Sequence, residues 1–148
     1  MSPTDSTAFN TRALPQTLCL RRLYVLRATY LLIIVGLGAQ VWPDIISPPA
    51  DLGNAASALR GLLGAVALMA VVGIRYPLKM IPLLLFELVW KTIWVLAFGL
   101  PRWLAGDMSA GMQETLYACL MGLVLFPIVI PWGYVVSQYV KAEGDRWR

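Results

Sequence analysis

The sequence lacks histidine altogether and contains only two cysteines, Cys19 and Cys119. The absence of histidine removes the commonest general base and a frequent protein ligand of haem. Cys19 precedes the first apolar stretch whereas Cys119 lies inside the last one, so the two thiols are not expected to form a disulfide. They also lack the C-x-x-C spacing of a metal site. The sequence therefore predicts neither a metal site nor a cofactor.

Charged residues are also scarce, at 14% of the 148 residues, against the roughly one quarter that is typical of soluble domains. Hydrophobic residues make up 59%, and the mean hydropathy is +0.69. Much of the surface is therefore expected to face something other than water. The net charge of +4 does not indicate nucleic-acid binding, because the basic residues lie beside apolar stretches, as membrane anchors do.

Four apolar stretches are long enough to cross a lipid bilayer as helices, at about residues 23–42, 55–74, 78–100 and 114–140. At a rise of ~1.5 Å per residue, about 20 residues span a hydrocarbon core of ~30 Å. We expect an all-α membrane protein with a four-transmembrane-helix bundle at 21–140, a flexible cytoplasmic tail at 1–20 and a cytoplasmic C-terminal tail at 141–148. The alternative is a soluble protein with unusually apolar helices. Against it, residues 28–40 and 61–74 lack the regularly spaced polar positions of soluble helices.

Lysine and arginine residues are distributed unequally between the two sides of such a bundle. Nine lie on the side of the termini and two on the opposite side, while Lys91 lies inside the third stretch. Because basic residues accumulate in cytoplasmic segments, both termini are expected to be cytoplasmic (N-in/C-in). The nine are Arg12, Arg21, Arg22, Arg27, Arg75, Lys79, Lys141, Arg146 and Arg148, and the two are Arg60 and Arg102.

Two opposite charges, Glu87 and Lys91, lie within the third stretch, four residues apart and so on one helix face. Counted from Lys79, they lie ~12 and ~18 Å deep. A charge at that depth costs at least ~2.5–3.5 kcal/mol, so it normally faces the bundle and has a partner. Arg27, at a similar depth in the first stretch, would complete a polar cluster. The pair is either an ion pair that fixes helix packing or a relay or counter-charge for a transported solute.

Aromatic residues form a second stripe on the same helix, at Phe86, Trp90 and Trp94. Their i, i+4, i+8 spacing predicts a common face. This face either packs against lipid and neighbouring helices or forms the wall of a site for an apolar or cationic ligand.

The fourth stretch contains two prolines, Pro127 and Pro131. Because proline has no amide hydrogen, the carbonyls of Leu123 and Pro127 are expected to lack helical partners. Such carbonyls either mark a simple kink or coordinate a ligand, as in broken transporter helices. Tyr134 adds a hydroxyl near the cytoplasmic end of this stretch.

Close helix packing is indicated by two small-x-x-x-small motifs, Gly61 to Ala65 and Ala118 to Gly122, which serve the bundle or a homo-oligomer. No enzyme motif is present. We therefore expect a non-enzymatic structural, interaction or accessory protein whose partners are the lipid bilayer and, in addition, a second copy or another membrane protein. The alternative is a small oligomeric transporter or channel that uses Glu87, Lys91 and Arg27.

The segment from Arg75 to Trp103, the motif PWGYVVSQYV and the closing GDRWR resemble a family of small uncharacterised bacterial inner-membrane proteins. The resemblance covers mainly residues 75–148. It implies a four-helix arrangement in the bacterial cytoplasmic membrane, and it transfers no activity and no catalytic residue.

Overall fold

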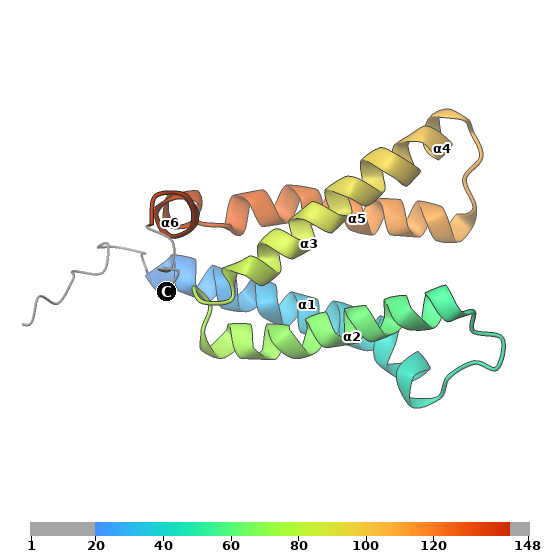
Figure 1. Ribbon diagram of the computed structural model, residues 1–148, viewed down its shortest axis with the longest axis horizontal. Coiled ribbons are helices and arrows are strands. Elements are labelled where there is room, and N and C mark those ends of the chain that lie inside the picture. Colours follow the sequence, from blue (N-terminus) through green and yellow to red (C-terminus); the bar gives the residue numbers. More distant parts are fainter. Residues whose placement is uncertain (1–19, 143–148) are drawn as a thin grey trace, which may run out of the picture.

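The computed structural model describes residues 20–142, which form helices and contain no strand (Figure 1). Four helices in this part of the chain are long and apolar enough to cross a membrane: Leu20–Ile46, Asn54–Arg75, Ile81–Leu104 and Ala110–Val129. The prediction of four long apolar helices is therefore confirmed. The predicted tails fall almost entirely on residues 1–19 and 143–148, outside the described residues.

The first two helices, α1 (Leu20–Ile46) and α2 (Asn54–Arg75), form an antiparallel hairpin (Figure 1). They contain the predicted spans 23–42 and 55–74. Near the connecting loop, the Nε of Arg60 lies 2.5 Å from an Asp44 carboxylate oxygen. At the other end, the Tyr30 hydroxyl donates a hydrogen bond of 3.0 Å to the carbonyl of Pro77, just beyond α2. The hairpin is thus joined by polar contacts at both ends.

The third apolar helix consists of α3 (Ile81–Trp94), a π-helical turn η1 (Val95–Gly99) and α4 (Leu100–Leu104). The amide of Leu100 donates to the carbonyl of Val95, five residues back. Pro101 has no amide hydrogen to continue the α-helical pattern, which accounts for a local widening at this point. The helix therefore begins three residues later than predicted and ends four residues later.

The fourth helix corrects the prediction of one span over 114–140. Helix α5 (Ala110–Val129) begins after Ser109, whose hydroxyl accepts from the Met112 amide, and ends eleven residues earlier than expected. Ile130 is extended, with ψ of 124°, because the ring of Pro131 disfavours helical geometry in the preceding residue. Helices α6 (Trp132–Val135) and η2 (Val136–Val140) follow. Figure 1 shows α6 end-on, across the direction of the long helices.

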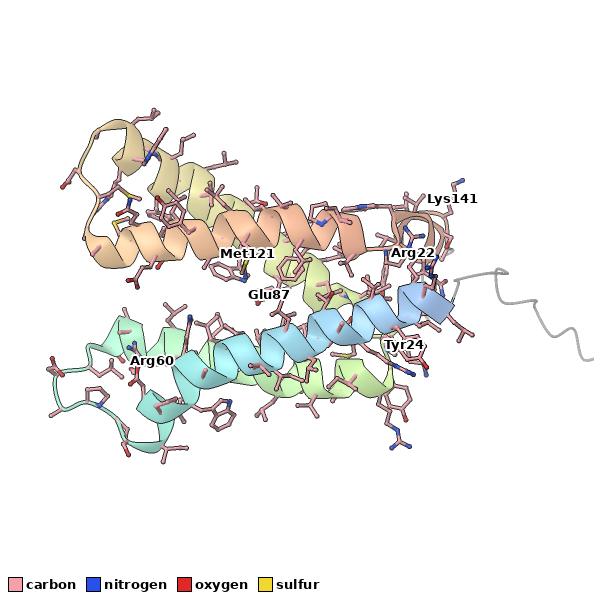
Figure 2. All side chains as sticks on the ribbon, turned by 180° about the vertical axis from the view of Figure 1, so that it is seen from behind. Arg22, Tyr24, Arg60, Glu87, Met121 and Lys141 are labelled. Atoms are coloured by element: carbon pink, nitrogen blue, oxygen red, sulfur yellow. The ribbon has the colours of Figure 1, made fainter. Side chains whose placement is uncertain are left out.

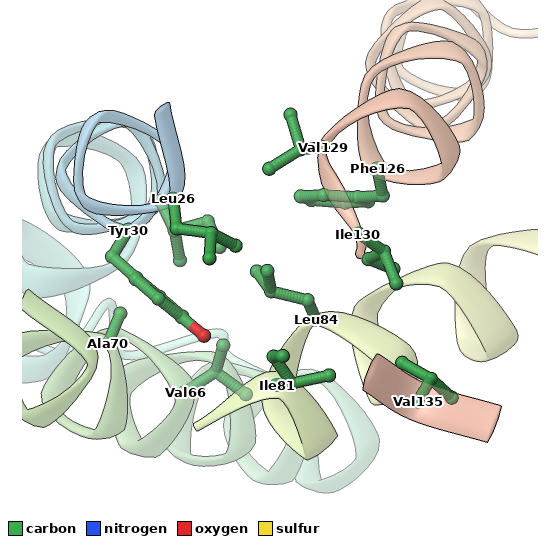
Figure 3. Packing of buried hydrophobic residues seen from close by; sticks show 11 residues of the cluster. Leu26, Tyr30, Val66, Ala70, Ile81, Leu84, Phe126, Val129, Ile130 and Val135 are labelled. Carbon is green, nitrogen blue, oxygen red and sulfur yellow. The ribbon is translucent and has the colours of Figure 1, made fainter. Parts of the chain in front are cut away.

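Helices α3 and α5 form a second hairpin, which meets the first at the end of the molecule that carries α6 and separates from it toward the loops (Figure 1). The main core lies at the end where the two hairpins meet, and Figure 3 shows how its side chains pack. A smaller cluster of Val95, Leu116 and Cys119 holds the second hairpin together. The main core consists of Leu26, Tyr30, Ile33, Val66, Ala70, Ile81, Leu84, Phe126, Val129, Ile130 and Val135.

The outward faces of all four long helices carry large exposed apolar side chains. Water would not support such a continuous apolar surface, whereas lipid tails solvate it. The fold is therefore that of a multi-pass membrane protein. Examples from the four helices are Leu31 and Val35, Leu68 and Val71, Val89 and Ile93, and Val124 and Ile128.

Candidate functional site

A cavity of about 410 Å³ lies between the two hairpins. Helices α1, α2, α3 and α5 all contribute to its wall, which is mainly apolar. This volume falls within the range of small-molecule sites. The principal apolar residues are Leu32, Ile33, Leu37, Leu63, Trp94, Met121, Leu125 and Phe126, and the polar ones are Gln40, Glu87, Lys91 and Thr115.

The predicted pair of Glu87 and Lys91 lies in this wall, and Figure 2 shows Glu87 between the two hairpins. Glu87 is 1% exposed and Lys91 is 9% exposed. The Lys91 ammonium donates a hydrogen bond to Oε2 of Glu87, one helical turn away. The pair therefore neutralises its own charge inside an apolar wall, as a charge at membrane depth requires.

Aromatic rings and a glycine accommodate the lysine side chain. The Nζ atom of Lys91 lies 4.1 Å from the centroid of the Trp90 ring and 5.4 Å from that of Phe126. Both ring systems attract a cation through the negative potential of their faces. On α5, a Cβ atom at Gly122 would lie 2.8 Å from both Cδ and Cε of Lys91. A glycine here therefore leaves the space that the lysine stem occupies.

Two buried polar atoms at the cavity have no hydrogen-bond partner among the described residues: Oε1 of Glu87 and Nε1 of Trp90. Both residues line the cavity. A buried polar atom that makes no hydrogen bond costs about 1–3 kcal/mol, and native proteins satisfy nearly all such atoms. The free acceptor and the free donor lie three residues apart on α3, and both atoms are themselves buried.

Arg27 does not join the pair. It is exposed on α1, its guanidinium carbon lies 5.8 Å from the centroid of the Tyr24 ring, and it is not part of the cavity wall. The neighbouring residues Leu26 and Tyr30 face the core instead. The rotation of α1 therefore places Arg27 on the outside, although its depth suits a contact with Glu87.

The predicted aromatic and proline residues divide into two groups. Trp90 and Trp94 line the cavity, whereas Pro127, Pro131 and Tyr134 lie outside its wall. The carbonyl of Pro127 accepts a hydrogen bond of 2.9 Å from the indole nitrogen of Trp132. The two prolines therefore shape the end of α5, and the Pro127 carbonyl is engaged within the chain.

The wall residues on α5, among them Cys119, Gly122 and Phe126, had not been identified as site residues from the sequence. Gly122 belongs to a small-x-x-x-small motif, which indicated helix packing only. The motif does allow a close approach, but what approaches Gly122 is the Lys91 side chain from α3. The signal in the sequence that could have identified Gly122 was the presence of a lysine inside one apolar helix and a glycine inside another.

Within residues 20–142, no three histidine, cysteine, aspartate or glutamate side chains gather into a group that would hold a metal ion. No family model, no curated protein and no solved structure matches the chain. The fold and the cavity define the class, a multi-pass helical membrane protein with a polar pair inside its wall.

Proposed function

We propose that the chain is a non-enzymatic accessory protein of the bacterial cytoplasmic membrane that binds a small molecule within the bilayer. The observation that carries this proposal is the mainly apolar cavity of about 410 Å³ between the two hairpins, which has the buried pair of Glu87 and Lys91 in its wall. The apolar side chains of the wall receive the hydrocarbon part of such a ligand, and the few polar side chains orient its polar part.

The rim of the cavity supports uptake from the lipid phase. Leu32 of α1 is 50% exposed and Met121 of α5 is 63% exposed, and both line the cavity. In a membrane these side chains contact lipid tails. A molecule dissolved in the bilayer therefore reaches the cavity between α1 and α5.

The polar groups of the cavity favour binding over catalysis. Glu87 and Lys91 engage each other, and the Cys119 thiol has no histidine beside it because the chain contains none. Nucleophilic catalysis requires a nucleophile with an adjacent base that is free to accept its proton. This arrangement supports the non-enzymatic proposal.

The proposed orientation places both termini in the cytoplasm. Figure 2 shows Arg22 and Lys141 at one end of the molecule and Arg60 at the other. Other basic residues that share the first end are Arg21 at the start of α1, Arg75 at the end of α2 and Lys79 in the turn that follows. We expect green fluorescent protein fused to the C-terminus to fluoresce, and alkaline phosphatase inserted at Gly106 to be active. An active phosphatase fused at the C-terminus would contradict the orientation.

Filling the cavity tests the proposed function. An added Cβ at Gly36, a wall residue, meets no atom within 4 Å, and the same holds for Gly61, which lies outside the wall. We expect Gly36→Phe to lower the affinity for a dodecyl ligand at least tenfold, because the phenyl ring occupies the space of the ligand chain. Gly61→Phe is the matched control, and native mass spectrometry of the detergent-purified protein measures bound ligand.

A small oligomeric transporter is the second candidate, favoured by one observation. The cavity lies between hairpins that are in contact at one end and separated at the other, as alternating access requires (Figure 1). Proton flux into liposomes that is lost in Glu87→Gln would favour this candidate, and the absence of flux with the unmodified protein would reject it. Transport by so small a chain favours assembly with a second copy or another membrane protein.

A further inference from the structure

We infer that the end of the molecule that carries α6 binds the headgroup of an anionic phospholipid, with Arg75 and Lys79 in contact with its phosphate. This inference goes beyond the proposed ligand cavity and does not depend on it. It is based on the separation of charge along the molecule, on three side chains near the turn between α2 and α3, and on the orientation of α6.

The charged side chains are separated between the two ends of the described chain. Six exposed basic residues lie in the first third of α1, at and after the end of α2, and after η2. The acidic residues within 20–142 lie toward the opposite end, apart from Glu87, which is paired with Lys91. The end with α6 therefore attracts anions. The six basic residues are Arg21, Arg22, Arg27, Arg75, Lys79 and Lys141, and the acidic ones opposite are Asp44, Asp51, Asp107 and Glu114.

Two of these cations lie close to one tyrosine ring. The guanidinium carbon of Arg75 lies 5.7 Å from the centroid of the Tyr76 ring, and the Nζ atom of Lys79 lies 5.6 Å from the same centroid. The Nε atom of Arg75 also donates a hydrogen bond of 3.2 Å to the Tyr76 hydroxyl. All three side chains are exposed, so a ligand outside the molecule reaches them directly.

The backbone of this turn is fixed to the first hairpin. The buried Tyr30 hydroxyl donates a hydrogen bond of 3.0 Å to the carbonyl of Pro77, between the two cationic residues. The Met80 amide donates a hydrogen bond of 3.2 Å to the carbonyl of Tyr76. The turn therefore holds both cations on an ordered backbone, while their long side chains remain free to adjust to a ligand.

The hydrogen-bond donors of the turn suit a phosphate group. A guanidinium carries five N–H groups and an ammonium carries three. The contact of Arg75 with Tyr76 uses Nε, which leaves the N–H groups of the two terminal nitrogens. A phosphodiester has two unesterified oxygens that share one negative charge, and charge-assisted hydrogen bonds to such oxygens are the stronger kind. Arg75 and Lys79 therefore provide donors and compensating charge for one phosphate.

The orientation of α6 places this end at the level of the lipid headgroups. Figure 1 shows α6 across the long helices, at the same end of the molecule as the turn between α2 and α3. Val135 packs into the main core, whereas Trp132 and Tyr139 are 45% and 51% exposed. A short helix that lies across a bundle and exposes tryptophan and tyrosine is typical of the membrane–water interface. Lipid phosphates lie at this level.

The net charge of the lipid determines which headgroup binds. Phosphatidylcholine has a phosphate, but its own ammonium group cancels the charge and is repelled by the basic residues. Phosphatidylglycerol has the same phosphate and a net charge of about −1 at neutral pH, so its attraction to the basic end is not cancelled. We therefore expect selection for anionic headgroups.

Three probes test the inference: dioleoylphosphatidylglycerol, dioleoylphosphatidylcholine and inorganic phosphate. The two lipids have the same acyl chains, so contacts of the chains with the protein contribute equally to both. Each is titrated into the full-length protein in detergent, and native mass spectrometry measures the bound fraction. We expect phosphatidylglycerol to bind at least about tenfold more tightly than phosphatidylcholine, and this preference to fall when the ionic strength is raised to about 0.5 M. Equimolar inorganic phosphate should not displace the lipid.

Charge-removing variants locate the preference. Arg75→Gln should reduce the preference for phosphatidylglycerol over phosphatidylcholine about fivefold, and Lys79→Gln should do the same, because each removes one cation that contacts the phosphate. Arg102→Gln is the matched control, since Arg102 is also an exposed arginine but lies at the opposite end of the molecule. It should leave the preference unchanged.

Equal affinity for the two lipids, or displacement of phosphatidylglycerol by equimolar inorganic phosphate, overturns the inference. A loss of preference in Arg102→Gln as large as that in Arg75→Gln also overturns it. The comparison of lipids on the unmodified protein remains decisive if a variant does not fold. Gly36→Phe should weaken binding of a dodecyl ligand and keep the preference for phosphatidylglycerol, so the cavity and the headgroup site can fail independently.

Discussion

Glu87→Ala is expected to destabilise the folded protein by about 3–5 kcal/mol, because it leaves the ammonium of Lys91 buried without a counter-charge. Glu87 is 1% exposed and Lys91 is 9% exposed, so water cannot replace the lost partner without a rearrangement. Replacing both residues by leucine removes both charges together and should cost much less. Unfolding in mixed micelles, followed by circular dichroism, measures the difference.

The ion pair of Asp44 and Arg60 provides the matched control. Its side chains are 31% and 32% exposed and lie near the loop between α1 and α2. Asp44→Ala should therefore cost no more than about 1 kcal/mol. If Glu87→Ala cost as little stability as Asp44→Ala, or no more than the double leucine variant, the structural importance assigned to the buried pair would be wrong.

Gly73→Ala is expected to destabilise the protein by about 3 kcal/mol through a clash between α2 and α1. A Cβ at Gly73 would lie 2.6–2.7 Å from three atoms of the Tyr30 ring. The ring cannot simply turn away, because it is buried and its hydroxyl donates to the carbonyl of Pro77. The substitution therefore adds overpacking to the loss of a buried hydrogen bond.

Gly61→Ala, on the same helix, is the control for Gly73→Ala. The added Cβ meets no atom within 4 Å, so the change should stabilise α2 by up to about 1 kcal/mol through helix propensity alone. The same unfolding measurement compares the two variants. Equal stability of the two would show that Tyr30 does not pack against Gly73 as closely as described.

The apolar helices could be predicted from the sequence because lipid solvation depends on the local run of side chains. Residues 28–40 and 61–74 lack regularly spaced polar positions, and α1 and α2 contain them. The pairing of Glu87 with Lys91 could also be predicted, since helical periodicity alone brings residues i and i+4 together. Both properties are set within a single helix.

Properties that depend on other helices could not be predicted. The apolar residues of α1 occupy all of its faces, so they give no signal for its rotation, and the outward position of Arg27 could not be predicted. Pro127 and Pro131 look alike in the sequence, yet α5 continues through the first and ends before the second. The indole of Trp132 takes the carbonyl of Pro127, and Ile130 packs into the core, so tertiary contacts accompany the break.

The cavity itself depends on the angle between two hairpins, which no local pattern encodes. Its wall draws on four helices, and the sequence identified only its α3 residues, Glu87, Lys91, Trp90 and Trp94. The opposing wall on α5 includes Gly122, whose role follows from the position of Lys91. The sequence thus identified part of the α3 wall and missed the parts of the wall on α1, α2 and α5.

The central claim is that the space between the hairpins is a binding site. Titration of the unmodified protein, Gly36→Phe and Gly61→Phe with dodecanol tests it most directly. We expect saturable binding of one molecule to the unmodified protein and to Gly61→Phe, and at least tenfold weaker binding to Gly36→Phe. Equal binding by all three proteins, or an uptake that never saturates, would contradict it.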